Sequence, residues 1–298
     1  MLVLVAPGQG AQKPGFVTPW LELPGLADRL AAWSDIAGID LIAYGTTAGE
    51  DEIKDTAVAQ PLLVATAIAA AEALDATPDL LAGHSVGELA AAALAGVVTA
   101  EQALELVRVR AQAMAKAATV TETGMTAVLG GDEQEVLAAL DRHGLTPANT
   151  NGAGQIVAGG TLEQLAALKE EPPARARLIP LKVAGAFHTV HMAPAVTALR
   201  ESATAITPAE PRVKLLSNAD GKVVGSGSEF VERLINQVSN PVRWDACMAT
   251  MTELGVTEMI ELLPGGTLTG LAKRGMPGVR TVALKTPDDL DAARELIK

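Results

Sequence analysis

The stretch Leu80-Leu81-Ala82-Gly83-His84-Ser85-Val86-Gly87-Glu88-Leu89-Ala90 decides the fold. A short apolar run stops at a GxSxG pattern and continues as an alanine-rich segment, which predicts a strand, a tight turn and a helix. In such a nucleophile elbow the glycines leave room for a strained backbone, and the serine hydroxyl stands at the helix N-terminus. Glu88 lies in the first helical turn, where the helix dipole favours a carboxylate. A bare GxSxG also fits an ordinary serine-capped turn, but the flanking strand and helix favour Ser85 as a nucleophile.

Other apolar runs predict a parallel sheet around this elbow. Residues 2–6 form a continuous apolar run that ends at Pro7-Gly8-Gln9-Gly10. Further strands are expected at 213–217, 258–263 and 280–284. Helices are expected at 61–74, 100–118 and 229–237, with one more that ends at 254 and another that begins after 286. Apolar strands that alternate with helices are typical of parallel sheets covered on both faces. Ligands gather beyond the carboxyl ends of such strands, so Gln9 is either a ligand-binding residue or an ordinary loop amide.

Residues 125–183 follow a different order of elements. Strands are expected at 125–129, 148–151, 155–158 and 177–183, and helices at 132–142 and 162–169. The order β-α-β-β-α-β is the signature of a ferredoxin-like domain. We therefore expect an α/β protein with two domains. Residues 1–120 and 186–298 would form a large α/β-hydrolase-like domain with a parallel sheet, and 121–185 an inserted small ferredoxin-like domain.

The composition excludes several classes of protein. The 298 residues are 49% hydrophobic and 19% charged, as in globular proteins, and the net charge of −12 argues against a nucleic-acid-binding surface. A single cysteine, Cys247, excludes an intramolecular disulfide and a thiolate metal cluster. No basic segment precedes the first apolar run, and uncharged apolar runs are shorter than the roughly 18 residues of a membrane span. We expect a cytoplasmic, soluble protein.

The segment 100–118 places one arginine where a charge is unfavourable. Its polar residues recur at helical spacing, and the opposite, apolar face consists of Ala103, Val107, Arg110, Met114 and Ala117. Arg110 therefore lies on the side of the helix that should be buried. A buried charge without a partner is strongly unfavourable, so Arg110 requires an anion. Either a structural carboxylate of the protein or the carboxylate of a ligand would satisfy it.

A serine nucleophile requires a base, and a neutral histidine is the usual one near pH 7. In an elbow His84 points away from its neighbouring serine, and His143 ends a helix, which leaves His188 and His191. An ordinary α/β-hydrolase has the order serine, acid, histidine, with the histidine near the C-terminus and an HGGG oxyanion loop. Here about 110 residues follow His188, no HGGG occurs, and the acids between Ser85 and His188 lie on solvated helix faces or in the inserted domain. We therefore expect a base that is oriented by a group other than a carboxylate.

A set of motifs runs through the chain in a fixed order: Pro7-Gly8-Gln9-Gly10, Gly83–Glu88, Arg110, Asn151–Gly159, Gly185-Ala186-Phe187-His188-Thr189, Asn240-Pro241-Val242-Arg243-Trp244 and Pro264-Gly265. Together they resemble the malonyl-CoA:acyl carrier protein transacylases of fatty-acid and polyketide synthesis. The resemblance covers essentially the whole chain. It implies an acyltransferase that moves a malonyl group from malonyl-CoA to the phosphopantetheine thiol of acyl carrier protein.

The resemblance also implies roles for individual residues. Ser85 is the acylated nucleophile, His188 is its base, and the main-chain carbonyl of Gln237 orients that histidine. The N–H groups of Val86 and Gln9 form the oxyanion hole. The substrate-binding residues implied are Arg110, which pairs with the malonyl carboxylate, Met114, and Phe187, which crowds an α-methyl group.

The expected partners are malonyl-CoA and an acidic acyl carrier protein. A basic patch for the carrier protein is expected at Arg175, Arg177, Lys182, Lys273 and Arg274. No metal or cofactor is implied, neither nucleic acid nor a membrane is an expected partner, and a monomer is expected. Two alternatives remain open: a serine hydrolase or thioesterase that releases free acid, and a carrier-protein-binding module without activity. The sequence does not distinguish fatty-acid from polyketide synthesis.

Overall fold

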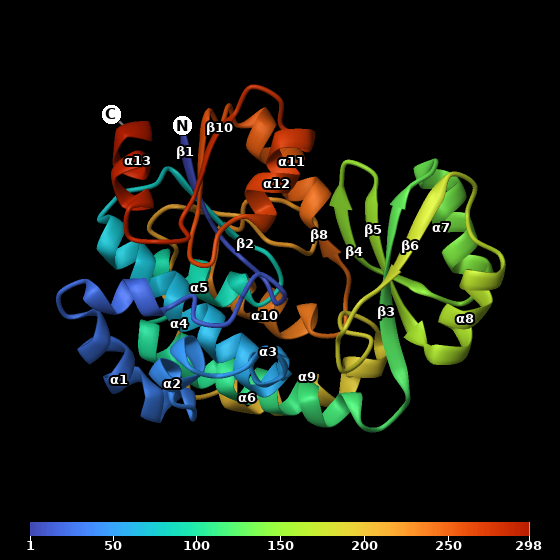
Figure 1. Cartoon of the computed structure of the whole chain (residues 1–298), viewed down its shortest axis with the longest axis horizontal. Coiled ribbons are helices and arrows are strands. Elements are labelled where there is room, and N and C mark those ends of the chain that lie inside the picture. The colour runs from blue at the N-terminus through green and yellow to red at the C-terminus, as the bar shows by residue number, and fades with distance from the viewer. Residues whose placement is uncertain (298) are drawn as a thin grey trace.

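Two β-sheets lie side by side in the computed structural model of this chain, which describes residues 1–297 (Figure 1). The first sheet is parallel in each of its pairings. Its strand order is β10-β9-β1-β2-β7. These strands are β1 (Leu2–Ala6), β2 (Leu80–Gly83), β7 (Lys214–Leu215), β9 (Glu258–Glu261) and β10 (Arg280–Ala283). The predicted parallel sheet of a mixed α/β fold is confirmed.

The second sheet is built mainly from the segment with the βαββαβ order. Its strand order is β6-β3-β5-β4-β8, with antiparallel pairing except between β4 and β8. These strands are β3 (Thr123–Gly130), β4 (Thr146–Gly152), β5 (Gln155–Thr161), β6 (Ala176–Pro180) and β8 (Val242–Arg243). Strand β8 comes from the distant C-terminal third of the chain and was not predicted. In the chain it lies between β7 and β9 of the first sheet, so it ties the second sheet to the first.

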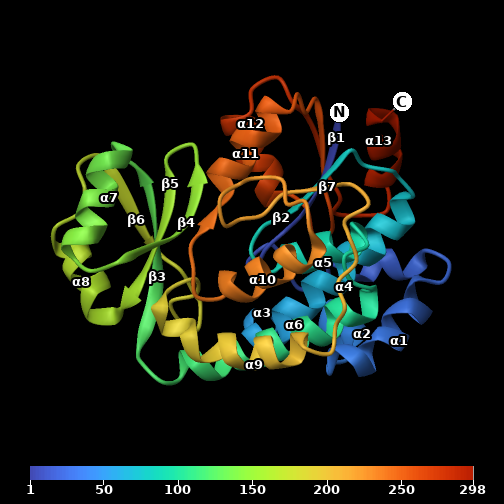
Figure 2. The same cartoon turned by 180° about the vertical axis from the view of Figure 1, so that it is seen from behind.

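Helices surround both sheets (Figures 1 and 2). The α-helices are α1 (Leu26–Ala37), α2 (Leu41–Thr46), α3 (Glu50–Lys54), α4 (Thr56–Leu74), α5 (Gly87–Leu94), α6 (Ala100–Ala118), α7 (Glu133–Arg142), α8 (Leu162–Glu170), α9 (Ala193–Ala203), α10 (Gly227–Gln237), α11 (Trp244–Glu253), α12 (Thr267–Gly275) and α13 (Asp289–Leu296). Short 3₁₀ helices span Thr18–Glu22 and Val190–Met192. Helices α4, α5 and α6 pack against one another, while α7 and α8 lie against the second sheet.

Helix α4 begins earlier than predicted. The expected start at Pro61 was wrong, because the side chain of Asp55 accepts a hydrogen bond from Ala57 N and caps the helix at Thr56. Pro61 therefore lies inside the helix, where it cannot donate a backbone hydrogen bond.

Helix α4 is long and apolar enough, at 19 residues, to span a membrane by length and composition, although Glu72 interrupts its uncharged run. However, 83% of its most apolar window is buried inside the protein, as in a core helix.

Helices α9 and α12 were not predicted. The N-terminus of α12 follows Gly265-Gly266, without a local capping side chain. The carboxylate of Glu261, at the end of β9, instead accepts hydrogen bonds from the N–H groups of Gly266, Leu268 and Thr269. A cap supplied from a preceding strand leaves no helix-start signal in the local sequence.

Candidate active site

The GxSxG segment forms a sharp turn between β2 and α5. Ser85 has a φ of 54°, a left-handed conformation that is rare outside glycine. A Cβ on Gly83 would lie 2.0 Å from the carbonyl carbon of Gly87, and one on Gly87 would lie 2.3 Å from Ala6 O. Both positions therefore require glycine because other backbone passes through the space of a side chain. The structure has the strand–turn–helix geometry that the sequence predicts.

His188 is in direct contact with the serine. Its Nε2 lies 2.7 Å from Ser85 Oγ, and its Nδ1 lies 2.8 Å from the main-chain oxygen of Gln237. A carbonyl accepts the Nδ1 proton, which leaves Nε2 free to accept the serine proton. This is the geometry expected for a base oriented without a carboxylate.

Burial keeps the imidazole of His188 neutral. The side chain is almost fully buried. Desolvation, and then the nearby charge of Arg110, lower the pKa of His188 to about 3. The ring is therefore neutral near pH 7, the form in which Nε2 can accept a hydrogen bond from Ser85 Oγ.

Arg110 lies beside the nucleophile and is 1% exposed. Its Nη1 donates to Gln60 Oε1 at 2.5 Å, and its Nη2 donates to Gln237 Oε1 at 3.0 Å and to Ser85 Oγ at 3.5 Å. Nε has no hydrogen-bond partner within residues 1–297. Desolvation lowers the pKa of Arg110 to about 10, opposed by the charge of Glu88, so the group stays cationic.

Of the two anions considered for Arg110, a structural carboxylate does not contact it directly. Across the described part of the chain its hydrogen-bond acceptors are two amide oxygens and a hydroxyl. These acceptors hold the guanidinium in place without neutralising it. The charge of Arg110 remains available to a ligand next to Ser85, where Nη2 lies.

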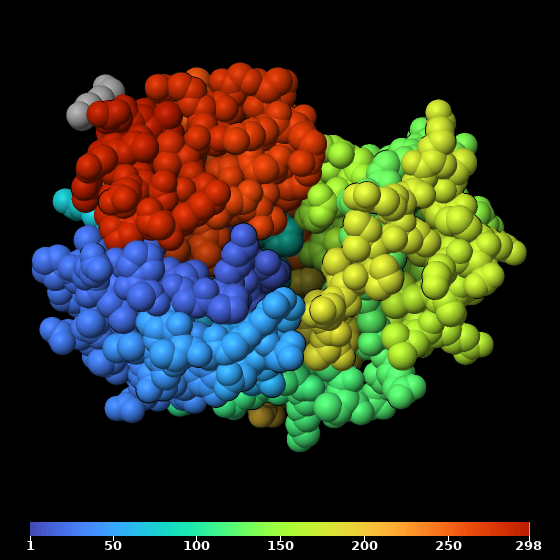
Figure 3. Space-filling model, in the orientation of Figure 1, coloured from blue at the N-terminus to red at the C-terminus, as the bar shows by residue number. Residues whose placement is uncertain are grey.

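A cavity of about 200 Å³ opens at this point between the two sheets. Figure 3 shows a hollow where the red C-terminal part, the blue N-terminal part and the yellow-green second sheet meet. The predicted site residues Gln9, Ser85, Val86, Arg110, Met114, Phe187 and His188 all line the cavity. Gln237 lies behind it and reaches His188 and Arg110 through hydrogen bonds.

Some residues of the site were missed by sequence reasoning. Gln60 holds Arg110, and it is a buried polar residue in the largely apolar helix α4, so the argument that singled out Arg110 could have found it. The Nε2 of His84 lies 2.8 Å from Asn151 Oδ1, and both residues line the cavity. Asn218 contacts the elbow from the loop after β7, and no local pattern marks it.

Glu88 differs from its predicted role at a helix N-terminus. It is fully buried, and its two carboxyl oxygens accept hydrogen bonds from Asn218 N and Gln237 Nε2, each at 2.5 Å. Burial raises the pKa of Glu88 to about 8, opposed by the Asn218 N–H and by the charge of Arg110. The carboxyl is part of a buried polar network beneath the elbow, so the helix-dipole role was an incomplete prediction.

The predicted basic residues lie at two places on the surface. Lys273 and Arg274 are exposed in the last turn of α12, a helix whose earlier residues line the cavity. Arg175, Arg177 and Lys182 are exposed on β6 and its flanking residues. Lys182 lies between Leu181 and Val183, which line the cavity, whereas Arg175 and Arg177 lie towards the other end of β6.

Comparison with known proteins identifies the family. Residues 3–286 match the family described as acyl transferase domain. The chain belongs to the acyl transferase family. This acyl transferase is 52% identical over 302 residues to the malonyl CoA-acyl carrier protein transacylase of Mycobacterium tuberculosis strain H37Rv, covering 99% of this chain and 100% of the relative.

Solved structures agree with this assignment. The crystal structure of MCAT from Mycobacterium tuberculosis has a TM-score of 0.95 at 52% identity, covering 98% of this acyl transferase and 99% of that chain. A second similar structure is that of a type II polyketide-synthase acyl-carrier protein (holo) in complex with its malonyl-transacylase. Its matched chain has a TM-score of 0.92 at 31% identity, with 99% of each chain covered.

Proposed function

We propose that this acyl transferase moves a malonyl group from malonyl-CoA to the phosphopantetheine thiol of an acyl carrier protein, through a malonyl ester on Ser85. One observation carries the proposal: the Ser85 hydroxyl lies between a neutral histidine, 2.7 Å away, and a buried guanidinium, 3.5 Å away. The histidine supplies a base for the hydroxyl. The guanidinium supplies a cation next to the hydroxyl, with which the free carboxylate of a malonyl thioester bound at Ser85 would pair.

In the first half-reaction His188 Nε2 takes the proton from Ser85 Oγ, which attacks the thioester carbonyl. The developing oxyanion is stabilised by the N–H groups of Val86 and Gln9, and such donors are each worth about 10²–10³ in rate in other enzymes. The tetrahedral intermediate collapses, the C–S bond breaks, and the imidazolium returns its proton to the sulfur of coenzyme A. The products are coenzyme A and malonyl-Ser85.

The second half-reaction reverses these steps with another thiol. The phosphopantetheine thiol gives its proton to His188 and attacks the ester carbonyl of malonyl-Ser85. The C–O bond breaks, and His188 returns the proton to Ser85 Oγ. The carrier protein leaves with the malonyl group, and the enzyme is regenerated without net oxidation or reduction.

Selectivity follows from the cavity walls. Arg110 pairs with the malonyl carboxylate and so favours malonyl over acetyl groups. Phe187 and Met114 form apolar walls around the acyl group, and both are buried. Phe187 leaves little room for an α-methyl group, and turnover of methylmalonyl-CoA as fast as malonyl-CoA would contradict this role.

The finer description of the fold is also part of the proposal. The order β6-β3-β5-β4 with antiparallel pairing supports a ferredoxin-like domain at 121–185. The parallel sheet with a serine elbow after β2 supports an α/β-hydrolase-like domain at 1–120 and 186–298. The active site would then lie between the two domains, with the acyl group bound at their junction.

Other sequence-based expectations stay predictions. We expect the protein to be a cytoplasmic monomer that needs no metal or cofactor and binds neither nucleic acid nor a membrane. The carrier protein would dock on the basic patch of Arg175, Arg177, Lys182, Lys273 and Arg274, as the acidic nature of such proteins favours.

A transfer assay tests the proposed function. The enzyme is mixed with malonyl-CoA and a holo acyl carrier protein, and the mass of the carrier protein and the release of coenzyme A are followed together. We expect one malonyl-carrier protein per coenzyme A released, and neither product with the Ser85→Ala variant. Release of coenzyme A with free malonate instead would favour the hydrolase alternative.

A further inference from the structure

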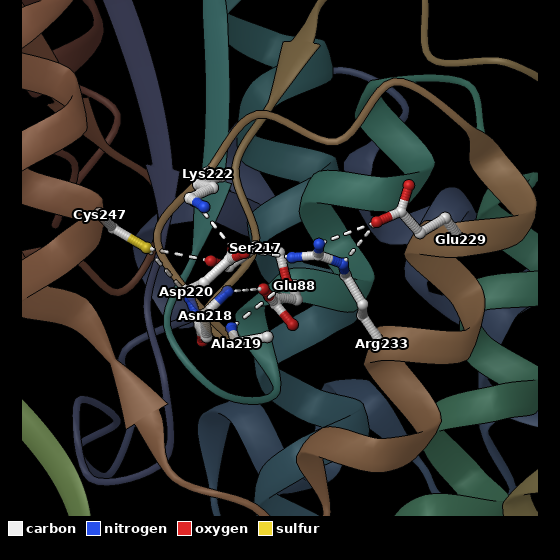
Figure 4. Close-up of polar contacts among 9 residues, drawn as sticks. All are labelled: Glu88, Ser217, Asn218, Ala219, Asp220, Lys222, Glu229, Arg233 and Cys247. Carbon is white, nitrogen blue, oxygen red and sulfur yellow. Dashed lines mark hydrogen bonds and ion pairs between the residues drawn. The ribbon is translucent and has the colours of Figure 1, made fainter.

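Asn218 is a fully buried amide in the loop after β7, directly behind the nucleophile. Its Nδ2 donates to Gly83 O at 2.8 Å, and its Oδ1 accepts from Ser85 N at 2.8 Å. Figure 4 shows this loop next to Glu88, with a hydrogen bond between Asn218 and the Glu88 carboxyl. Asn218 therefore binds the backbone of the elbow at two points, Gly83 and Ser85.

These two hydrogen bonds continue the parallel sheet. In a parallel ladder, one residue donates to the carbonyl before its partner residue and accepts from the N–H after it. Leu216 N donates to Leu81 O in this way, as the last backbone step between β7 and β2. At the next step the side-chain amide of Asn218 brackets His84 in the same manner, between Gly83 O and Ser85 N.

The elbow needs such a substitute because the neighbouring strand has ended. After the hydrogen bond of Leu216 N the backbone leaves the sheet, and Asn218 N turns to donate to Glu88 Oε1. Without the Asn218 side chain, a buried carbonyl and a buried N–H on either side of His84 would have no partner from this loop. The left-handed conformation of Ser85 is strained and persists only because neighbouring groups hold it. If the Ser85 N–H lost its acceptor, the hydroxyl could move.

We propose that Asn218 is a positioning residue for the nucleophile: its side-chain amide replaces the missing β7 peptide and fixes the Ser85 elbow in its reactive geometry. Asn218 also contacts the residue that orients the base, since its Oδ1 accepts from Gln237 Nε2 at 3.2 Å. One amide thereby fixes the serine relative to the His188–Gln237 pair. This inference rests on the proposed role of Ser85 as the nucleophile.

Asn218→Ala tests the inference, with Asn236→Ala as the matched control. Asn236 is a surface asparagine of α10 that bonds to Arg200 and Glu232 and does not contact the elbow. Two quantities are measured on folded protein: the single-turnover rate of Ser85 acylation by malonyl-CoA with its concentration dependence, and the rate of Ser85 labelling by phenylmethylsulfonyl fluoride. The second needs neither coenzyme A nor a carboxylate.

For Asn218→Ala we expect both rates to fall about 100-fold, as a misplacement of about 1 Å would cause. The malonyl-CoA concentration for half-maximal rate should change less than about threefold, because Arg110 is untouched. The control should match the wild type. Wild-type rates in a folded Asn218→Ala protein would overturn the inference, since a merely structural amide would lower the melting temperature and leave Ser85 reactive.

If Asn218→Ala does not fold, Asn218→Asp decides. It keeps the shape and the acceptor for Ser85 N–H but loses the donor to Gly83 O, so we expect a roughly tenfold slower labelling. Labelling at the wild-type rate would again overturn the inference. Failure of the premise that Ser85 is the nucleophile gives a different result, because the wild-type protein itself would then form no adduct on Ser85. A serine hydrolase would still be labelled at Ser85 and is distinguished by the release of free malonate in the transfer assay.

Discussion

Acid tolerance of the acylation step is the most distinctive consequence of the buried base. The proposed mechanism requires neutral His188, and burial lowers the pKa of that histidine to about 3. A histidine with the ordinary pKa of roughly 6.5 would be neutral in only about 3% of molecules at pH 5, whereas His188 would be neutral in about 99%. The expected difference in acylation rate at that pH is therefore about 30-fold.

The same shift affects stability, with a sign that can be worked out. A histidine whose folded pKa is lowered stabilises the fold above its unfolded pKa, and this stability is lost as the pH falls from about 6.5 towards 3, by about 1.4 kcal/mol per pH unit. Glu88 has a raised pKa of about 8, so its contribution falls as the pH rises from about 4.5 to 8. Between about pH 4.5 and 6.5 the two slopes offset each other, and the enzyme should remain folded during the measurement.

The assay is single-turnover acylation by saturating malonyl-CoA at about pH 5, 6 and 7.5, quenched in acid and followed by intact mass. Circular dichroism at each pH confirms that the protein is folded. We expect the rate at pH 5 to stay within about threefold of that at pH 7.5. A loss of about 30-fold with a midpoint near pH 6.5 would refute the buried neutral base, because it would show an ordinary solvated histidine.

Further predictions concern the substrate, the partner and stability. Arg110→Ala should lower malonyl loading about 100-fold, for two charge-assisted hydrogen bonds of about 1.5 kcal/mol each, with acetyl loading little changed; an unchanged malonyl-to-acetyl ratio would contradict this. Reversing both charges with Lys273→Glu and Arg274→Glu should raise KM for the carrier protein about tenfold and reduce its salt dependence, without affecting loading from malonyl-CoA; an unaltered KM argues against docking there. Urea unfolding at pH 6.5 and 8 should show the wild type losing about 2 kcal/mol through Glu88, and Glu88→Gln should lose less; equal losses would mean that Glu88 does not titrate in this range.

Features set by neighbouring residues were predictable from the sequence. The elbow depends on glycines two positions either side of Ser85, where the backbone of Gly87 and Ala6 leaves no room for a Cβ. Arg110 was placed on the buried face of its helix by spacing alone, and it is indeed 1% exposed. The parallel sheet followed from continuous apolar runs, since strands buried on both faces need no alternation.

Features that depend on contacts between distant segments were not predictable. Helix α12 is capped by Glu261 of the preceding strand, and β8 pairs with a strand almost 100 residues earlier in the chain. Asn218 meets the elbow 133 residues away. The Glu88 carboxyl was expected to interact with the dipole of its own helix. In the structure it also accepts hydrogen bonds from Asn218 and Gln237, which come from distant segments. Such contacts exist only once the fold has brought the segments together.

In the proposed mechanism Ser85 carries the malonyl group between the two thiols. Incubation with malonyl-CoA, acid quench and peptide mapping test it directly, with Ser85→Ala as the control. We expect a malonyl ester on the peptide containing Ser85 that a holo acyl carrier protein removes rapidly and water removes slowly. An adduct on another residue, no adduct despite turnover, or discharge to water as fast as to the carrier protein would contradict it.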